Sequence, residues 1–162
     1  MKNLVLIRHA KSSWEHNVSD DQRPLEKRGT SDAHLVSQEF KVQNFQPDKI
    51  FSSHANRALT TCKIFLENLE ISDKLLVKSQ ELYDFSGRNV ENFIKSMDDR
   101  LNDVMIFGHN YAFTSISNNF GSTFIDNLPT CGLVWIQFDV DSWKDVKQGT
   151  TKLIIRPKDL KT

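Results

Sequence analysis

Two side chains that can hold an anion and react with it, Arg8 and His9, follow directly on the aliphatic run from Leu4 to Ile7. Four consecutive aliphatic residues are too few for a helix and are typical of a strand buried on both faces of a mostly parallel sheet. Ligands bind such sheets at the carboxyl ends of the strands. A lone Arg-His pair in that place is also compatible with a solvated loop. We expect an anion site with a nucleophile or base if other strand ends supply matching residues.

A second arginine and a second histidine stand at further strand ends. The segment Lys49 to Ser53 predicts a strand, and Arg57 follows in the first turn of a helix expected over residues 56–69. The amino end of a helix favours anions, because free N–H groups and the positive end of the dipole gather there. The apolar run Val104 to Phe107 then repeats the opening pattern and leads to His109. The paired N–H donors of an arginine guanidinium match the spacing of phosphate oxygens. Two arginines and two histidines at strand ends therefore indicate a phosphate site.

The elements that must position these residues alternate along the chain. Apolar residues at three- and four-residue steps predict helices over residues 25–40, 56–69, 90–101 and 111–120. Short apolar runs predict further strands at 75–77, 132–138 and 152–156, the last two antiparallel at the sheet edge. Gly29 is expected to let the first helix approach the sheet closely. We expect one α/β domain over residues 1–162, with a mostly parallel sheet and an antiparallel edge.

Composition limits the classes of partner. Lysine and arginine total 21, as do aspartate and glutamate, so the formal net charge is zero. No global field then attracts nucleic acid or an anionic membrane, and we expect neither as a partner. The four-residue amino-terminal apolar run is too short for a signal peptide or a membrane span, so we expect a cytoplasmic protein. Cys62 and Cys131 lack zinc-site spacing and are expected to be reduced packing residues.

Several blocks of the sequence resemble the histidine phosphatase (phosphoglycerate mutase-like) superfamily, most closely its SixA-like phosphohistidine phosphatase branch. The resemblance runs along nearly the whole chain and keeps the order of the blocks. They are Arg8-His9-Ala10-Lys11-Ser12-Ser13-Trp14, Asp21-Gln22-Arg23-Pro24-Leu25, the stretch from Ser52 to Thr61, Gly108-His109-Asn110, and Pro129-Thr130-Cys131-Gly132.

This resemblance implies a three-layer α/β/α sandwich and a covalent phosphohistidine on His9. It also implies a pocket in which Arg8, Arg57 and His109 hold the phosphoryl oxygens, with no metal or other cofactor. The chemistry of these residues is consistent with that role, because phosphoryl transfer is catalysed mainly by positioning and charge stabilisation. His9 must be neutral to attack, and its cationic neighbours lower its pKa.

The chain departs from the family pattern in three places. Ala10 stands where glycine is common, and Tyr111 stands where proline is common and lies close to the expected pocket rim. Relatives carry a glutamate acid at a place that here resembles Asp84, which is therefore the matched candidate for the general acid. Asp21 and Glu81 are the alternatives for that role, and any of the three can instead be an ordinary solvated carboxylate.

The favoured function is a metal-independent, monomeric phosphatase that acts on phosphohistidine in proteins. The first alternative is a phosphomonoesterase for a small phosphorylated metabolite, although no inserted segment is long enough to close over such a substrate. The second is a non-catalytic module that recognises phosphate, which the presence of His9 disfavours. A metallophosphatase is less favoured because histidines and aspartates do not cluster at metal-ligand spacings.

Overall fold

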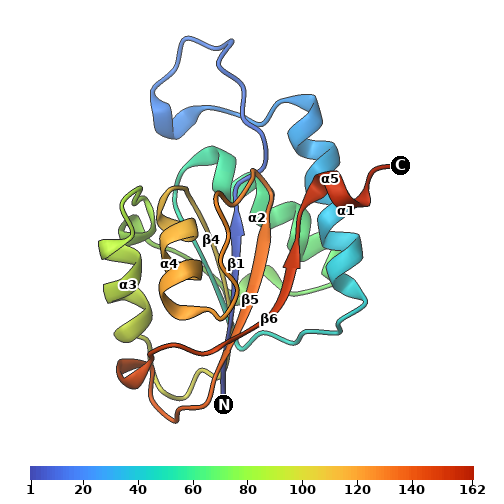
Figure 1. Cartoon of the computed structure of the whole chain (residues 1–162). Helices are drawn as coiled ribbons and strands as arrows, with labels where there is room; N and C mark the ends of the chain where they lie inside the picture. Colours follow the sequence, from blue (N-terminus) through green and yellow to red (C-terminus); the bar gives the residue numbers. More distant parts are fainter.

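The computed structural model describes residues 1–162 and is built on one six-stranded sheet (Figure 1). The strand order is β3-β2-β4-β1-β5-β6. The strands are β1 (Lys2–Arg8), β2 (Lys49–Ser52), β3 (Leu76–Lys78), β4 (Asp103–Gly108), β5 (Leu133–Phe138) and β6 (Thr150–Ile155). The α-helices are α1 (Lys27–Lys41), α2 (Asn56–Leu69), α3 (Arg88–Lys95), α4 (Ala112–Phe120) and α5 (Pro157–Leu160). Short 3-10 helices occur at Asp20–Gln22, Asp73–Leu75, Gln80–Leu82 and Trp143–Asp145.

The register of the sheet brings the two histidine-bearing strand ends together. Strands β3, β2, β4 and β1 pair in parallel, while β5 pairs antiparallel with both β1 and β6. Arg8 is the register partner of Gly108, so His9 and His109 follow from neighbouring strands at one edge. The expected mostly parallel sheet with an antiparallel edge is confirmed.

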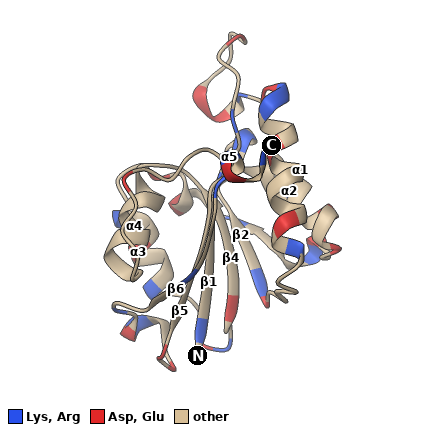
Figure 2. Cartoon of the chain, turned by 45° about the vertical axis from the view of Figure 1, so that its right-hand side comes forward, with Lys and Arg blue, Asp and Glu red and all other residues tan.

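Two layers of helices cover the sheet, which completes the α/β/α sandwich. Helices α3 and α4 lie on one face and α1, α2 and α5 on the other (Figures 1 and 2). Alternation along β1 divides the core between these layers, because successive strand side chains point to opposite faces. Leu4 and Leu6 pack toward α3 and α4, whereas Val5 and Ile7 pack toward α1 and α2. All four side chains are fully buried, as the opening aliphatic run predicted.

Some boundaries differ from the sequence prediction. Helix α3 ends at Lys95 rather than near residue 101, because Ser96 leaves helical geometry (φ −100°, ψ 1°). Met97 lies beyond the helix but still packs in the core on that face. Helix α1 begins at Lys27, and Leu25 instead forms an isolated antiparallel bridge with Ser12. The predicted free cysteines are confirmed, since both are reduced and buried.

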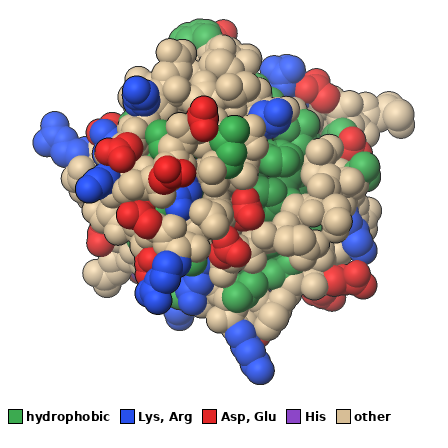
Figure 3. Space-filling view, turned by 90° about the horizontal axis from the view of Figure 1, so that it is seen from below, with side chains coloured by type: hydrophobic (Ala, Val, Ile, Leu, Met, Phe, Trp, Pro, Cys, Tyr) green, Lys and Arg blue, Asp and Glu red, His purple; other side chains and the backbone are tan.

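The face at the amino ends of the parallel strands lies opposite the histidines. Acidic and basic side chains are interspersed there, and no histidine is visible (Figure 3). None of the helices has the length and apolar character needed to cross a membrane.

Gly29 has a more specific place than the sequence predicted. A Cβ built on Gly29 would lie 2.1 Å from the carbonyl oxygen of Lys11, so at this position helix α1 contacts the loop just after His9, while residues further along the helix pack on the sheet. That oxygen accepts the Glu26 N–H at 3.0 Å and belongs to the backbone. Any side chain at position 29 must therefore displace the segment that follows His9.

We expect Gly29→Ala to destabilise the protein by about 1–3 kcal/mol through overpacking. The sign of this change in the free energy of unfolding identifies its cause, because a glycine-to-alanine substitution inside a helix ordinarily stabilises a protein by about 1 kcal/mol. Urea unfolding of Gly29→Ala measures the effect, with Ser31→Ala on the exposed side of α1 as the matched control. A stabilised Gly29→Ala protein would show that the Lys11 contact imposes no constraint.

Candidate active site

The backbone of His9 is fixed between two neighbouring segments. Its N–H donates to the carbonyl oxygen of Gly108 at 3.0 Å, and its own carbonyl accepts the N–H of Cys131 at 2.9 Å. The next residue is also held, since the Ala10 N–H donates to Thr61 Oγ1 at 2.9 Å. The sheet pairing thus extends one residue past β1 and sets the direction of the imidazole.

The ring of His9 has one nitrogen engaged and one free. Nδ1 lies 2.7 Å from the carbonyl oxygen of Ala10, which can only accept, so Nδ1 carries the proton and Nε2 keeps its lone pair. Burial lowers the pKa of His9 to about 3, helped by Arg57 and Arg8. The side chain is 8% exposed and is a neutral imidazole at neutral pH. It can therefore act as a nucleophile.

Arg8 and Arg57 line a cavity of about 290 Å³ together with His9. Arg8 donates through Nη1 to the carbonyl oxygen of Leu128 at 2.7 Å. Arg57 lies in the first turn of α2 and is almost fully buried. Burial and the neighbouring Arg57 charge lower the pKa of Arg8, which indicates two like charges held close together. Nε of each arginine is buried without a hydrogen-bond partner, an arrangement that a bound oxyanion would relieve.

His109 lies beside His9 but under a cover of aromatic rings. The two imidazole centroids are 5.4 Å apart, and His109 is 1% exposed. Tyr83 and Phe85 pack on it with centroids at 5.3 and 5.0 Å, and it does not line the cavity itself. Its Nε2 lies 2.8 Å from Ser53 Oγ, while Nδ1 is buried without a partner. Burial, then His9 and Arg57, keep the pKa of His109 far below its ordinary value.

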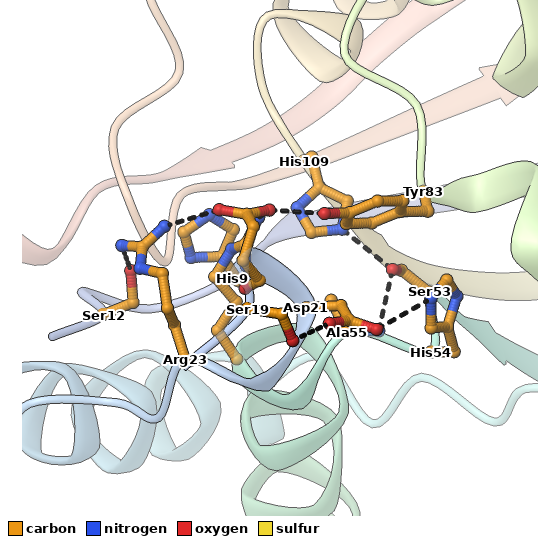
Figure 4. A network of polar contacts seen from close by, with 12 residues as sticks. His9, Ser12, Ser19, Asp21, Arg23, Ser53, His54, Ala55, Tyr83 and His109 are labelled. Atoms are coloured by element: carbon orange, nitrogen blue, oxygen red, sulfur yellow. Dashed lines mark hydrogen bonds and ion pairs between the residues drawn. The ribbon is translucent and has the colours of Figure 1, made fainter. Parts of the chain in front are cut away.

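Sequence reasoning missed Asp20, a carboxylate in the loop after β1 at the top of Figure 1. Arg57 donates to the Asp20 carbonyl oxygen at 2.6 Å and to Oδ2 at 2.9 Å, and Arg23 donates to Oδ1 at 3.1 Å. The Tyr83 hydroxyl also donates to Oδ2. Partial burial alone would raise the pKa of Asp20, but the bonds from Tyr83, Arg57 and Arg23 outweigh it and hold the carboxyl ionised. Figure 4 shows Arg23 and Tyr83 in this network beside His9.

The structure gives Asp84 a different task from the predicted general acid. Its oxygens accept the N–H groups of Ser86, Gly87, Asn89 and Val90 at 3.0–3.1 Å, so it caps the amino end of α3. Burial would raise the pKa of Asp84, but the bonds from Val90 and Ser86 outweigh it and lower the pKa. Both carboxyl oxygens are engaged by backbone N–H groups, which does not favour the expected role of Asp84 as the general acid, and that role stays a prediction.

The other residues considered for the rim or the acid role lie outside the cavity lining. Asp21 accepts from Ser19 Oγ at 2.7 Å and lies 3.8 Å from His54 Nε2. Glu81 is exposed in the 3-10 helix before Tyr83. Tyr111 is exposed at the start of α4 and does not contribute to the lining. Asp20 is therefore the one carboxyl group that reaches the cavity.

Two features of the surroundings bear on other kinds of chemistry. No group of three or more His, Cys, Asp or Glu side chains is placed to hold a metal ion. A larger cavity, of about 420 Å³, lies between residues 124–129 and the end of the chain, and contains none of the residues described above.

Comparison with known proteins places this geometry in a family. The family model described as the histidine phosphatase superfamily (branch 1) matches residues 4–83, which include Arg8, His9 and Arg57. An uncharacterised chloroplastic protein of Arabidopsis thaliana is 28% identical over 153 residues, which cover 89% of this chain and 70% of that protein. A 2,3-bisphosphoglycerate-dependent phosphoglycerate mutase of Mesorhizobium japonicum is 27% identical over 161 residues, covering 94% of this chain and 74% of the mutase.

The fold comparison agrees with the sequence match. The protein histidine phosphatase SixA, solved in complex with tungstate, superposes with a TM-score of 0.83 at 18% identity, covering 98% of this chain and 99% of that chain. The expected SixA-like, three-layer fold is thereby confirmed. The chain is therefore similar to the histidine phosphatase superfamily over residues 4–83 and shares the fold of SixA along nearly its whole length.

Proposed function

We propose that this protein is a metal-independent phosphatase that removes the phosphoryl group from phosphohistidine in proteins through a covalent phosphohistidine on His9. Support for the nucleophile comes from the neutral ring whose Nδ1–H is engaged by Ala10, which leaves the Nε2 lone pair free beside Arg8 and Arg57. A module that only recognised phosphate would not need this arrangement.

The proposed reaction has two steps. In the first, Nε2 of His9 attacks phosphorus, the new P–N bond forms, and the bond from phosphorus to the substrate imidazole breaks. Arg8 and Arg57 hold the phosphoryl oxygens, and their unpaired Nε groups supply donors for the growing charge. In the second step a water molecule attacks the phosphorylated His9, which releases inorganic phosphate and restores the neutral ring.

The hydrogen bonds that Asp20 accepts from Arg23, Arg57 and Tyr83 are the observation that supports the choice of substrate. Asp20 is the one carboxyl that lines the cavity, and its partners hold it ionised, so the cavity offers no carboxylic acid to protonate a leaving group. An alkyl ester must expel an alkoxide whose conjugate acid is about as weak as water, with a pKa of roughly 15.7. A phosphohistidine protonated on its free nitrogen expels neutral imidazole, whose conjugate acid has a pKa of about 6.5. The cavity therefore suits the phosphorus–nitrogen bond.

A small phosphate ester is the alternative substrate, and the likeness to a phosphoglycerate mutase favours it. The deciding experiment compares kcat/KM for a phosphohistidine-bearing protein with kcat/KM for a panel of alkyl phosphate esters. We expect the phosphohistidine protein to be hydrolysed at least about 10²-fold more efficiently, which is the lower end of the contribution of a general acid. If the enzyme instead hydrolyses one of the esters more efficiently, the alternative function, a phosphomonoesterase for a small metabolite, would be favoured.

The role of Asp20 gives a separate prediction. If Asp20 only neutralises Arg57, Asp20→Asn will change the hydrolysis of phosphohistidine and of alkyl esters by the same factor. If it donated a proton, the esters alone would lose roughly 10²- to 10⁴-fold. Measuring both substrates on both enzymes distinguishes these outcomes. Asp84→Asn is the control, and we expect it to lower the free energy of unfolding by about 1 kcal/mol through the weakened α3 cap.

The depressed pKa values of the two imidazoles predict a loss of stability in acid. Below pH 6.5 the unfolded chain protonates His9 and His109, while the folded protein holds both neutral down to about pH 3 for His9. The free energy of unfolding should then fall by up to about 1.4 kcal/mol per pH unit for each histidine as the pH drops. Urea titrations between pH 7 and pH 5 should show a shallower dependence of the free energy of unfolding on pH for His9→Asn than for the wild type. Equal slopes in wild type and His9→Asn would contradict the buried neutral ring.

Independence from metals is the last prediction from this site. Arg8, Arg23 and Arg57 line one cavity and supply the positive charge that a metal ion supplies in other phosphatases. Activity on phosphohistidine should survive dialysis against a strong chelator. Loss of activity with recovery on adding back one particular metal would overturn this part of the proposal.

A further inference from the structure

Two aromatic side chains stand out in the lining of the cavity, which is otherwise almost entirely polar. Trp14, in the loop after β1, is 74% exposed, and Phe85, between the Gln80–Leu82 turn and α3, is 45% exposed. A single exposed aromatic residue is normal on a protein surface. Here two of them come from segments about 70 positions apart and border the same cavity of about 290 Å³.

Each ring packs against a fixed neighbour and remains partly exposed. The Arg23 guanidinium lies 3.2 Å from the centroid of the Trp14 ring. Arg23 is itself fixed, because it donates to Asp20, to Ser12 Oγ and to the Ser13 carbonyl oxygen. The rim on this side is thus held in place before any substrate arrives.

Phe85 is held in a comparable way on the other segment. Its ring packs on His109 with centroids 5.0 Å apart and on Tyr83 at 5.2 Å. Tyr83 is anchored in turn by its hydroxyl, which donates to Asp20. Two pre-positioned aromatic surfaces therefore border the mouth of a site whose floor is made of arginines and imidazole.

We propose that Trp14 and Phe85 form an aromatic clamp that binds the planar ring to which the substrate phosphoryl group is attached. This inference rests on the proposed function and names the residues that would give it specificity. With the phosphoryl group on Arg8 and Arg57, a ring bonded directly to phosphorus must pass through the mouth that the two aromatics border. Aromatic faces favour stacked or edge-on contacts with a flat ring such as imidazole, and an aliphatic or ring-free group gains less from them.

The test compares two small substrates that share the phosphorus–nitrogen bond and differ in the ring. N-phosphorylimidazole carries the ring and phosphoramidate lacks it. We expect Trp14→Ala and Phe85→Ala each to lower the ratio of kcat/KM for N-phosphorylimidazole to kcat/KM for phosphoramidate by about three- to tenfold, mostly through KM. Trp14→Phe should restore most of the ratio, because it keeps an aromatic face.

The matched control is Phe124→Ala. Phe124 is also 74% exposed, but it lines the separate larger cavity, so its loss should leave the ratio unchanged. Equal losses on both substrates in Trp14→Ala would overturn the clamp, because they would show that Trp14 acts only by supporting Arg23. An unchanged ratio in both alanine variants would overturn it as well.

Failure of the proposed function would look different. A wild-type enzyme that hydrolyses phosphate esters but neither phosphorus–nitrogen compound would refute the phosphohistidine substrate. The clamp would then be tested with phenyl phosphate, which carries a ring, and ethyl phosphate, which lacks one. For each ester, kcat/KM of the Trp14→Ala and Phe85→Ala variants would be divided by kcat/KM of the wild type. A loss confined to phenyl phosphate would support the clamp, and equal losses would overturn it.

Discussion

The parallel pairing of β1 with β4 is the constraint on which the candidate site depends. Because Arg8 is in register with Gly108, the residues that follow the two strands, His9 and His109, come to lie with their rings 5.4 Å apart. A one-residue slip would turn every side chain of β1 to the opposite face. Leu4 and Leu6 would then exchange layers with Val5 and Ile7, and all four are fully buried. The core thereby fixes the direction in which His9 points.

The positive charge around the cavity is the second constraint on the site. Three arginines line one small cavity, which is unfavourable unless an anion offsets their repulsion. In the structure the Asp20 carboxylate supplies this charge by bonding to Arg23 and Arg57. The same surplus of positive charge, added to burial, keeps His9 neutral. The arginines that we propose to hold phosphate are thus among the groups that keep the His9 imidazole neutral.

The sequence predicted the parts of the site that depend on local pattern. Aliphatic runs and helical periodicity located the strand ends, so the residue pattern alone was enough to expect Arg8, His9, Arg57 and His109 at one edge of the sheet. Asp20 could not be found in this way, because its partners Arg57 and Tyr83 lie 37 and 63 positions away and its loop has no periodicity. Only the tertiary fold brings these residues together.

Asp84 shows a contact that the sequence analysis did not predict. The family resemblance pointed to an acid at this position, whereas in the structure Asp84 bonds to the Gly87 N–H and to the first turn of α3. The end of α3 was also misplaced, since Met97 continues the apolar stripe after the helix has stopped.

The most direct test of the account is to locate the phosphoryl group during turnover. Wild-type enzyme mixed with a phosphohistidine protein is quenched in alkali, where phosphohistidine survives, and is analysed by peptide mass spectrometry and phosphorus NMR. The account predicts one acid-labile phosphoryl group on Nε2 of His9, and none on His9→Ala, which should still fold. A phosphoryl group on another residue, on Nδ1, or turnover by His9→Ala would contradict it.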